Sequence, residues 1–221
     1  DLEPEKFATG EAANWRIFRI MSELVEGFEF LTKLQDDVTI LGTNSIKPGH
    51  PYYEAAYDLG LKLGQQKYSI LTGGGQGIME AANHGAYDAG ANSAGLNIAF
   101  DHEVRANPYV KSAVSFYFPF VRKLIITAPS LAFVVFPGGF GTLHQLFELL
   151  TLMQTGKMGR MPLILFGKSF WKPLDDFIKN ELAKKFKTID IKDIGLYTIV
   201  DKVDEAIKII KTVPRSFKSK I

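Results

Sequence analysis

Cysteine is the first residue type that this chain lacks, because none of its 221 residues is a cysteine. Disulfides and thiolate chemistry are therefore excluded, and a cytoplasmic location is the simplest expectation. No apolar run reaches the ~18–20 residues of a membrane-spanning helix, so we expect no membrane partner. The acidic first ten residues lack the basic and apolar regions that a signal peptide needs.

A large net charge of either sign is also missing. The formal net charge is +2, which is too small to predict general binding to nucleic acid. What is present is an ordinary globular composition, with 46% hydrophobic and 23% charged residues, and this argues against disorder. The length suits one domain and we find no repeat or linker, so residues 1–221 are interpreted as a single domain.

Apolar patterning predicts helices and strands in alternation. Such alternation is typical of a Rossmann- or flavodoxin-like α/β domain, a mostly parallel sheet with helices on both faces. These sheets bind ligands at the carboxyl ends of their strands. The basic tail from residue 214 is interpreted as a solvated end. Helices are expected at 12–31, 51–66, 78–89, 116–128, about 142–154, 170–184 and 203–210, and strands at 38–41, 68–71, 94–98, 131–136, 162–166 and 197–200.

Two glycine-rich turns, residues 73–77 and 137–142, each follow a predicted strand and precede a predicted helix. Glycine lets backbone N–H groups approach an anion, and a helix N-terminus adds donors and a favourable dipole. Thr142 and Gln145 also fit a Thr-x-x-Gln capping box, so a tight, well-capped turn is the alternative. Neither turn is a dinucleotide fingerprint or a P-loop, which favours one monophosphate as the ligand.

Histidine shows no pattern that predicts a metal site. The spacing of the four histidines matches no metal-ligand set, and no Ser-His-Asp arrangement is evident. We therefore expect no metal and no organic cofactor. His144 differs from the rest because it lies at the start of the helix beside the second glycine turn. The four are His50, His84, His102 and His144.

The run from Phe136 to Thr142, Phe-Pro-Gly-Gly-Phe-Gly-Thr, resembles the PGGxGTxxE signature of the LOG ("lonely guy") family, often labelled possible lysine decarboxylases. Decarboxylation has no support in the residues, which offer no lysine context for pyridoxal phosphate. The resemblance extends from about Asn14 to Ile210. Segments similar to the bacterial long-form branch are Trp15–Glu23, Pro51–Tyr53, Thr72–Glu80, Asn107–Tyr109 and Phe120–Lys123.

The resemblance implies an enzyme that hydrolyses the N-glycosidic bond of a purine nucleoside 5′-monophosphate, AMP or a cytokinin riboside monophosphate. The products are the base and ribose 5-phosphate. Members use no cofactor and form homodimers or larger homo-oligomers. The resemblance also implies that Arg122 orients the substrate while Glu80 and Gln145 contact ribose, although an arginine considered alone is more often a structural ion pair. Phosphate contacts are expected at Gly42, Thr43, Gly74, Gly75, Gly138, Gly139, Phe140, Gly141 and Thr142.

Two positions depart from the family pattern. Gln145 stands where the signature ends in glutamate, and Ser45 stands where many relatives carry arginine. Glycosidic cleavage passes through a cationic state that a carboxylate stabilises and a neutral amide does not. Glu80 is a candidate replacement, whereas Glu148 is interpreted as a rim residue. These departures keep open a non-catalytic alternative, a nucleotide or molybdenum-cofactor carrier of the same fold.

Two apolar segments and one lysine have open interpretations. The cluster at residues 116–118 has two interpretations: its side chains line the base pocket, or they pack in the core or in a dimer interface. The first helix, with Trp15 and Phe18, packs on a second subunit or on its own domain. Lys123 is expected to face solvent.

Overall fold

The computed structural model describes residues 11–100, 103–104, 106–128 and 130–215. Within these residues, no helix is both long and apolar enough to cross a membrane. The strands are β1 (Asp37–Leu41), β2 (Ser69–Thr72), β3 (Ser93–Phe100), β4 (Glu103–Val104), β5 (Ser112–Phe116), β6 (Ala132–Val135), β7 (Leu163–Phe166) and β8 (Thr198–Val200). The helices are α1 (Glu11–Thr32), α2 (Pro51–Gln65), α3 (Ile78–Asp88), α4 (Pro119–Ile126), α5 (Phe140–Gln154), α6 (Lys168–Phe177), the π-helical η1 (Ile178–Lys185), the 3₁₀ segment η2 (Ile191–Leu196) and α7 (Val203–Ile210).

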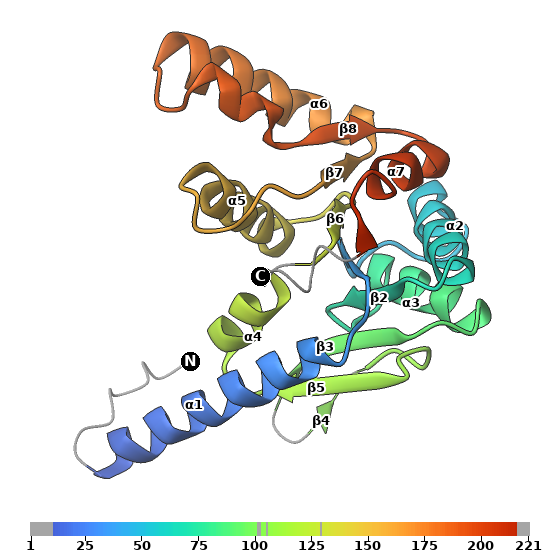
Figure 1. The fold of residues 1–221 in the computed structure, drawn as a ribbon, viewed down its shortest axis with the longest axis vertical. Helices are drawn as coiled ribbons and strands as arrows, with labels where there is room; N and C mark the ends of the chain where they lie inside the picture. Colours follow the sequence, from blue (N-terminus) through green and yellow to red (C-terminus); the bar gives the residue numbers. More distant parts are fainter. Residues whose placement is uncertain (1–10, 101–102, 105, 129, 216–221) are drawn as a thin grey trace.

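The strands form one sheet with a parallel body in the order β5-β3-β2-β1-β6-β7-β8 (Figure 1). Strand β4 pairs antiparallel with the end of β3. In the central strand, Val38 pairs with Ile70 on one side and with Ala132 on the other. The chain builds outward from β1 to β5 and then returns to β6. The predicted Rossmann-like sheet with helices on both faces is confirmed.

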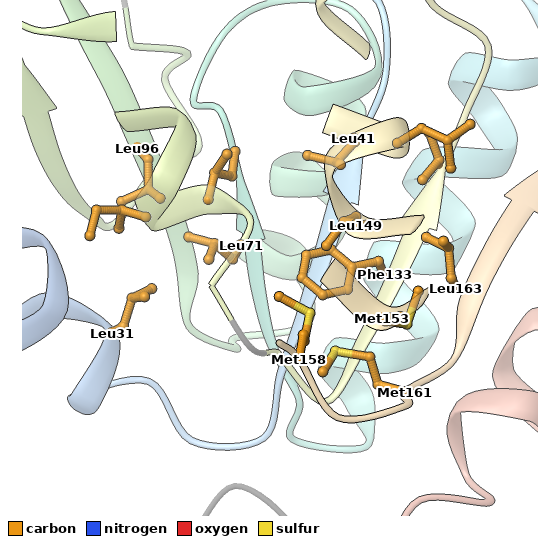
Figure 2. Packing of buried hydrophobic residues seen from close by; sticks show 14 of the residues in the cluster. Leu31, Leu41, Leu71, Leu96, Phe133, Leu149, Met153, Met158, Met161 and Leu163 are labelled. Atoms are coloured by element: carbon orange, nitrogen blue, oxygen red, sulfur yellow. The ribbon is translucent and has the colours of Figure 1, made fainter. Parts of the chain in front are cut away.

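Two hydrophobic cores lie on opposite faces of this sheet. Successive side chains of a strand point to opposite faces, so Phe133 and Val135 join one core while Val134 joins the other. The first core packs under α1, α4, α5 and η1, and Figure 2 shows Phe133 there among Leu149, Met153 and neighbouring residues. The second core packs under α2, α3 and α7. Burial on both faces explains why β6 is entirely apolar and β1 mostly so, with buried Asp37 and Thr39 as its polar residues.

Residues 116–128 were expected to form one helix, and this prediction is wrong at its start. Residues Ser112–Phe116 form β5, which pairs with β3, and α4 begins only at Pro119. The strand was missed because small and polar residues alternate with buried Val114 and Phe116 at the outer position of the sheet. Phe116 is fully buried in the first core, which resolves its role as packing.

Smaller differences concern the ends of elements. The predicted helix 170–184 begins at Lys168 and continues as η1, and neither β4 nor η2 was predicted. Helix α5 begins at Phe140 with Gly139 as its cap and no side-chain capping bond, so the capping box of Thr142 and Gln145 is wrong. Residues 216–221 of the basic tail lie outside the described residues. His102 lies outside them as well.

Candidate functional site

Three turns at the carboxyl ends of β1, β2 and β6 surround a cavity of about 640 Å³. These ends meet where the strand order reverses between β1 and β6, which is the position at which open α/β sheets bind ligands. Part of α4 closes one side of the cavity. The lining residues are Leu41, Gly42, Thr43, Asn44, Ser45, Gly73, Met79, Ile98, Pro119, Phe120, Arg122, Lys123, Ile126, Gly139, Gly141, Thr142, His144 and Gln145.

The turn after β1 ties the other two turns together. The Thr43 N–H donates to the Pro137 carbonyl at 3.1 Å, and the Thr43 carbonyl accepts from the Ile78 N–H at 3.0 Å. A side chain at Gly42 would come within 2.7 Å of Ile78, so only glycine permits this approach. Gly42 and Thr43, two of the residues at which phosphate contacts are expected, both line the cavity.

The turn after β2 is held from beneath by an asparagine. The Asn107 side-chain amide donates to the Gly74 and Gly75 carbonyls at 3.2 and 2.9 Å. Gly74 has a φ of +71°, a conformation that favours glycine. Of the glycines in this turn, Gly73 lines the cavity, whereas Gly74 and Gly75 do not. Asn107 belongs to the segment Asn107–Tyr109, which resembles the LOG family. Its hydrogen bonds show that this residue supports the turn after β2.

The turn after β6 presents the N-terminus of α5 to the cavity. Gly139, Gly141 and Thr142 line it, and the first N–H groups of a helix have no partner within the helix. Gly138 lies behind them, where an added Cβ would approach the Thr142 hydroxyl to 2.2 Å. The Phe140 side chain is 92% exposed and is not part of the lining. This terminus offers backbone donors and a positive dipole end to an anion.

Arg122 is the charged group that distinguishes the cavity. Its Nε donates to the Leu96 carbonyl at 2.8 Å and its Nη2 to the Gly73 carbonyl at 3.2 Å. Among the described residues no carboxylate pairs with it, so its remaining N–H groups are available to a ligand in the cavity that it lines. Burial alone lowers the pKa of Arg122 to about 10, which leaves it charged at neutral pH.

Gly73 makes room for this guanidinium. A Cβ at residue 73 would stand 2.1 Å from the Arg122 Nη2 atom, so any larger residue would displace the side chain. The pattern of the sequence marked the glycine-rich turn and the arginine separately. Their contact depends on how α4 packs against β3, and the sequence alone carried no signal for it.

A second cation lies at the rim. Lys123 lines the cavity, and its Nζ lies 3.1 Å from the Glu148 carboxylate and 3.3 Å from the His144 Nε2 atom. The expectation that Lys123 faces solvent is therefore wrong. Glu148 is half-buried in this ion pair, on the helix that also carries Gln145.

Among the described residues that line the cavity there is no carboxylate. Gln145 lines it at the position where the family signature has glutamate. Glu80 lies outside the lining, near Tyr53, where burial and then the charge of Glu80 raise the pKa of that phenol to about 12. The described residues also contain no cluster of three or more His, Asp or Glu that could hold a metal. The cavity therefore combines backbone donors with cationic side chains and suits an anionic ligand.

Comparison with solved structures places the fold among known proteins. A molybdenum cofactor binding protein from Rippkaea orientalis matches 81% of this chain and 98% of its own, with a TM-score of 0.63 and 20% identity. The molybdenum cofactor carrier protein of Chlamydomonas reinhardtii matches the same shares of the two chains, with a TM-score of 0.62 and 20% identity. At this level of identity the similarity establishes the shared fold.

Comparison of sequences identifies the family. The rice (Oryza sativa subsp. japonica) protein named cytokinin riboside 5′-monophosphate phosphoribohydrolase LOG is 30% identical over 148 residues, which span 65% of this chain and 60% of the rice protein. A protein of Arabidopsis thaliana with the same name, qualified as probable, is 31% identical over 140 residues, 61% of this chain and 68% of its own length. The model of the family described as "Possible lysine decarboxylase" matches residues 79–210. The chain therefore belongs to this family, which is the LOG family.

Proposed function

We propose that this protein binds a nucleoside 5′-monophosphate and hydrolyses its N-glycosidic bond, with AMP or a cytokinin riboside monophosphate as substrate. The observation that carries the proposal is the half-buried Arg122 guanidinium, which lines the cavity beside the N-terminus of α5. The names of the related plant proteins support this substrate class. We also propose that the chain belongs to the bacterial long-form branch, and the segments Trp15–Glu23 and Asn107–Tyr109 support this proposal.

In this proposal the backbone N–H groups of residues 139–142 bind the 5′-phosphate. Arg122 donates to a phosphate or ribose oxygen through its planar fork. A water oxygen forms a bond to C1′ while the bond from C1′ to the base nitrogen breaks; the base leaves with the electron pair and, by way of solvent, takes up the proton that the water loses. Gln145 contacts ribose. Because Glu80 lies outside the cavity lining, Gln145 is favoured over Glu80 as the group beside the sugar.

A non-catalytic carrier of a nucleotide or of the molybdenum cofactor is the second candidate. It is favoured because none of the described residues that line the cavity is a carboxylate, so the developing cation would lack a charged partner among them. The solved proteins of this fold that are titled as molybdenum cofactor binding or carrier proteins support the same candidate. Both functions use the same anion-binding turns, so binding alone does not distinguish them, whereas base release does.

The first prediction concerns where the phosphate binds. AMP soaked into crystals is expected to place its phosphate within hydrogen-bond distance of the N–H groups of residues 139–142, and calorimetry is expected to show binding. Adenosine, which lacks the phosphate, is the matched control and is expected to bind at least tenfold more weakly, because several charge-assisted bonds are lost. An anion found only elsewhere, with the α5 terminus empty, would contradict the proposed site.

The second prediction is a homodimer formed through α1. On this helix Phe18, Met21, Val25 and Phe28 recur at intervals of three and four residues and are all exposed, as is Trp15. Such a stripe is typical of a helix seam, and an exposed patch of this kind is unusual on a monomer. Figure 1 shows α1 alongside β5 and α4, with its first turns extending beyond them.

Light scattering at micromolar concentration is the measurement. We expect about twice the monomer mass of 24.6 kDa. Changing Phe18 and Val25 together to glutamate is expected to give the monomer mass, while changing the exposed Glu26 to alanine is expected to leave the dimer intact. A wild-type protein that remains at the monomer mass would show that this face pairs with something else or with nothing.

A further inference from the structure

Helix α4, which carries Arg122, begins without a cap of its own. Its N-cap residue is Phe118, whose side chain cannot accept a hydrogen bond, and Pro119 at the first helical position has no N–H. Phe118 is buried, so the N–H groups that lead into the helix need acceptors from elsewhere in the fold.

Glu23 of α1 provides these acceptors. One carboxylate oxygen accepts from the Tyr117 N–H at 3.0 Å and the other from the Phe118 N–H at 3.2 Å, across 94 and 95 residues of sequence. Glu23 is only 7% exposed. A buried carboxylate is costly unless it is fully bonded, and here the two N–H donors, the α4 dipole and Arg19 at 3.8 Å offset that cost.

Other contacts hold the two helices at this distance. The Arg19 guanidinium lies 4.0 Å from the centre of the Tyr117 ring, a cation–π contact on the residue that Glu23 binds. Toward the other end of α4, a Cβ at Gly27 would come within 2.7 Å of Ile125, so glycine allows the helices to touch. The contact of Arg19 with Tyr117 and the close approach of Gly27 to Ile125 thus hold α1 against α4 before and after Glu23 in the sequence.

The same residue, Phe118, connects Glu23 to Arg122. The Phe118 carbonyl accepts from the Arg122 N–H at 3.2 Å, and from there the side chain reaches the carbonyls of Leu96 and Gly73. We propose that Glu23 is a positioning residue for Arg122: it fixes the start of α4 and so holds the guanidinium toward the cavity. This inference rests on the proposed function for its effect on a ligand, but its structural part does not.

The test compares Glu23→Ala, Glu23→Gln and a control, Glu26→Ala, which removes an exposed carboxylate from the same helix. Two quantities are measured: AMP affinity by calorimetry, and the exchange rate of the Arg122 Nε–H proton by NMR. In Glu23→Ala we expect affinity to fall about tenfold and exchange to accelerate about tenfold, because two buried donors lose their acceptor. Glu23→Gln keeps one of the two acceptor oxygens and is expected to recover only part of both losses, and Glu26→Ala is expected to match the wild type.

Each outcome decides between the alternatives. Unchanged exchange of the Arg122 proton in Glu23→Ala would overturn the proposal, even if stability or affinity fell, because a purely structural role produces that result. Accelerated exchange in a protein whose wild type does not bind AMP would support the positioning role and reject the proposed function. If Glu23→Ala does not fold, Glu23→Gln decides: exchange faster than in Glu26→Ala supports the proposal, and equal exchange overturns it.

Discussion

Replacing Gln145 with glutamate is expected to raise the rate of base release from AMP by tenfold or more. The side chain lines the cavity on the first turns of α5, where a carboxylate would lie beside the cation that develops on ribose. A single preorganised electrostatic group typically raises a reaction rate by roughly 10²–10³. The increase in base release is therefore expected to be measurable even if the new carboxylate is not ideally placed. Glutamine and glutamate are nearly isosteric, and Gln145 makes no capping bond that the change would break.

The measurement is release of free base and ribose 5-phosphate from a panel of nucleoside monophosphates. The wild type is expected to be slow or inactive. Glu80→Gln is the matched control, since it removes the nearby carboxylate that lies outside the cavity lining, and we expect it to leave the rate unchanged. An active wild type that Glu80→Gln inactivates would assign the charge to Glu80. If no variant releases base from any monophosphate, hydrolysis is wrong and the carrier function replaces it.

Loss of the guanidinium in Arg122→Ala is expected to weaken AMP binding by about two orders of magnitude. Hydrogen bonds to charged groups contribute roughly 1.5–3 kcal/mol each, and a forked contact supplies two. The fold is expected to survive, because Arg122 pairs with no carboxylate of the described residues that would be left buried and unpaired. Arg122→Lys keeps the charge without the fork and is expected to bind with intermediate affinity.

Calorimetry on these variants, with circular dichroism to verify folding, is the measurement. Arg160→Ala removes an exposed arginine that does not line the cavity and is the matched control, with unchanged affinity expected. If Arg122→Ala binds AMP like the wild type, the guanidinium serves only to hold the Leu96 and Gly73 carbonyls, and the anion is bound by backbone groups alone.

The parallel sheet could be predicted because its central strands carry their own signal. Buried on both faces, β6 and β7 are short apolar runs between turn residues and β1 is mostly apolar, and their short length together with the flanking turn residues separates them from the helices. Strand β5 lacked that signal, because its side chains depend on β3 for burial. The missed segment changed the start of α4 by three residues, from 116 to 119.

The glycine turns of the candidate site were also visible in the sequence, since glycine density after a strand has a direct physical meaning. The directions in which the side chains point were not visible in the sequence. Lys123 was expected in solvent but lines the cavity, and Glu80 was expected near ribose but lies outside the lining. Whether a residue of α3 or α4 faces the cavity depends on how that helix docks on the sheet, and docking is decided by contacts far apart in the sequence.

The strand order has a consequence for how far this protein can be shortened. The stretch that matches the family model, residues 79–210, begins after β2, yet β1 and β2 lie in the middle of the sheet between β3 and β6. A fragment cut to that stretch would keep β3 with β5 and β6 with β7 and β8, but no strand would pair the two groups with each other. Each would expose an unpaired strand edge, which promotes aggregation. We therefore expect that the stretch matched by the family model does not fold without β1 and β2.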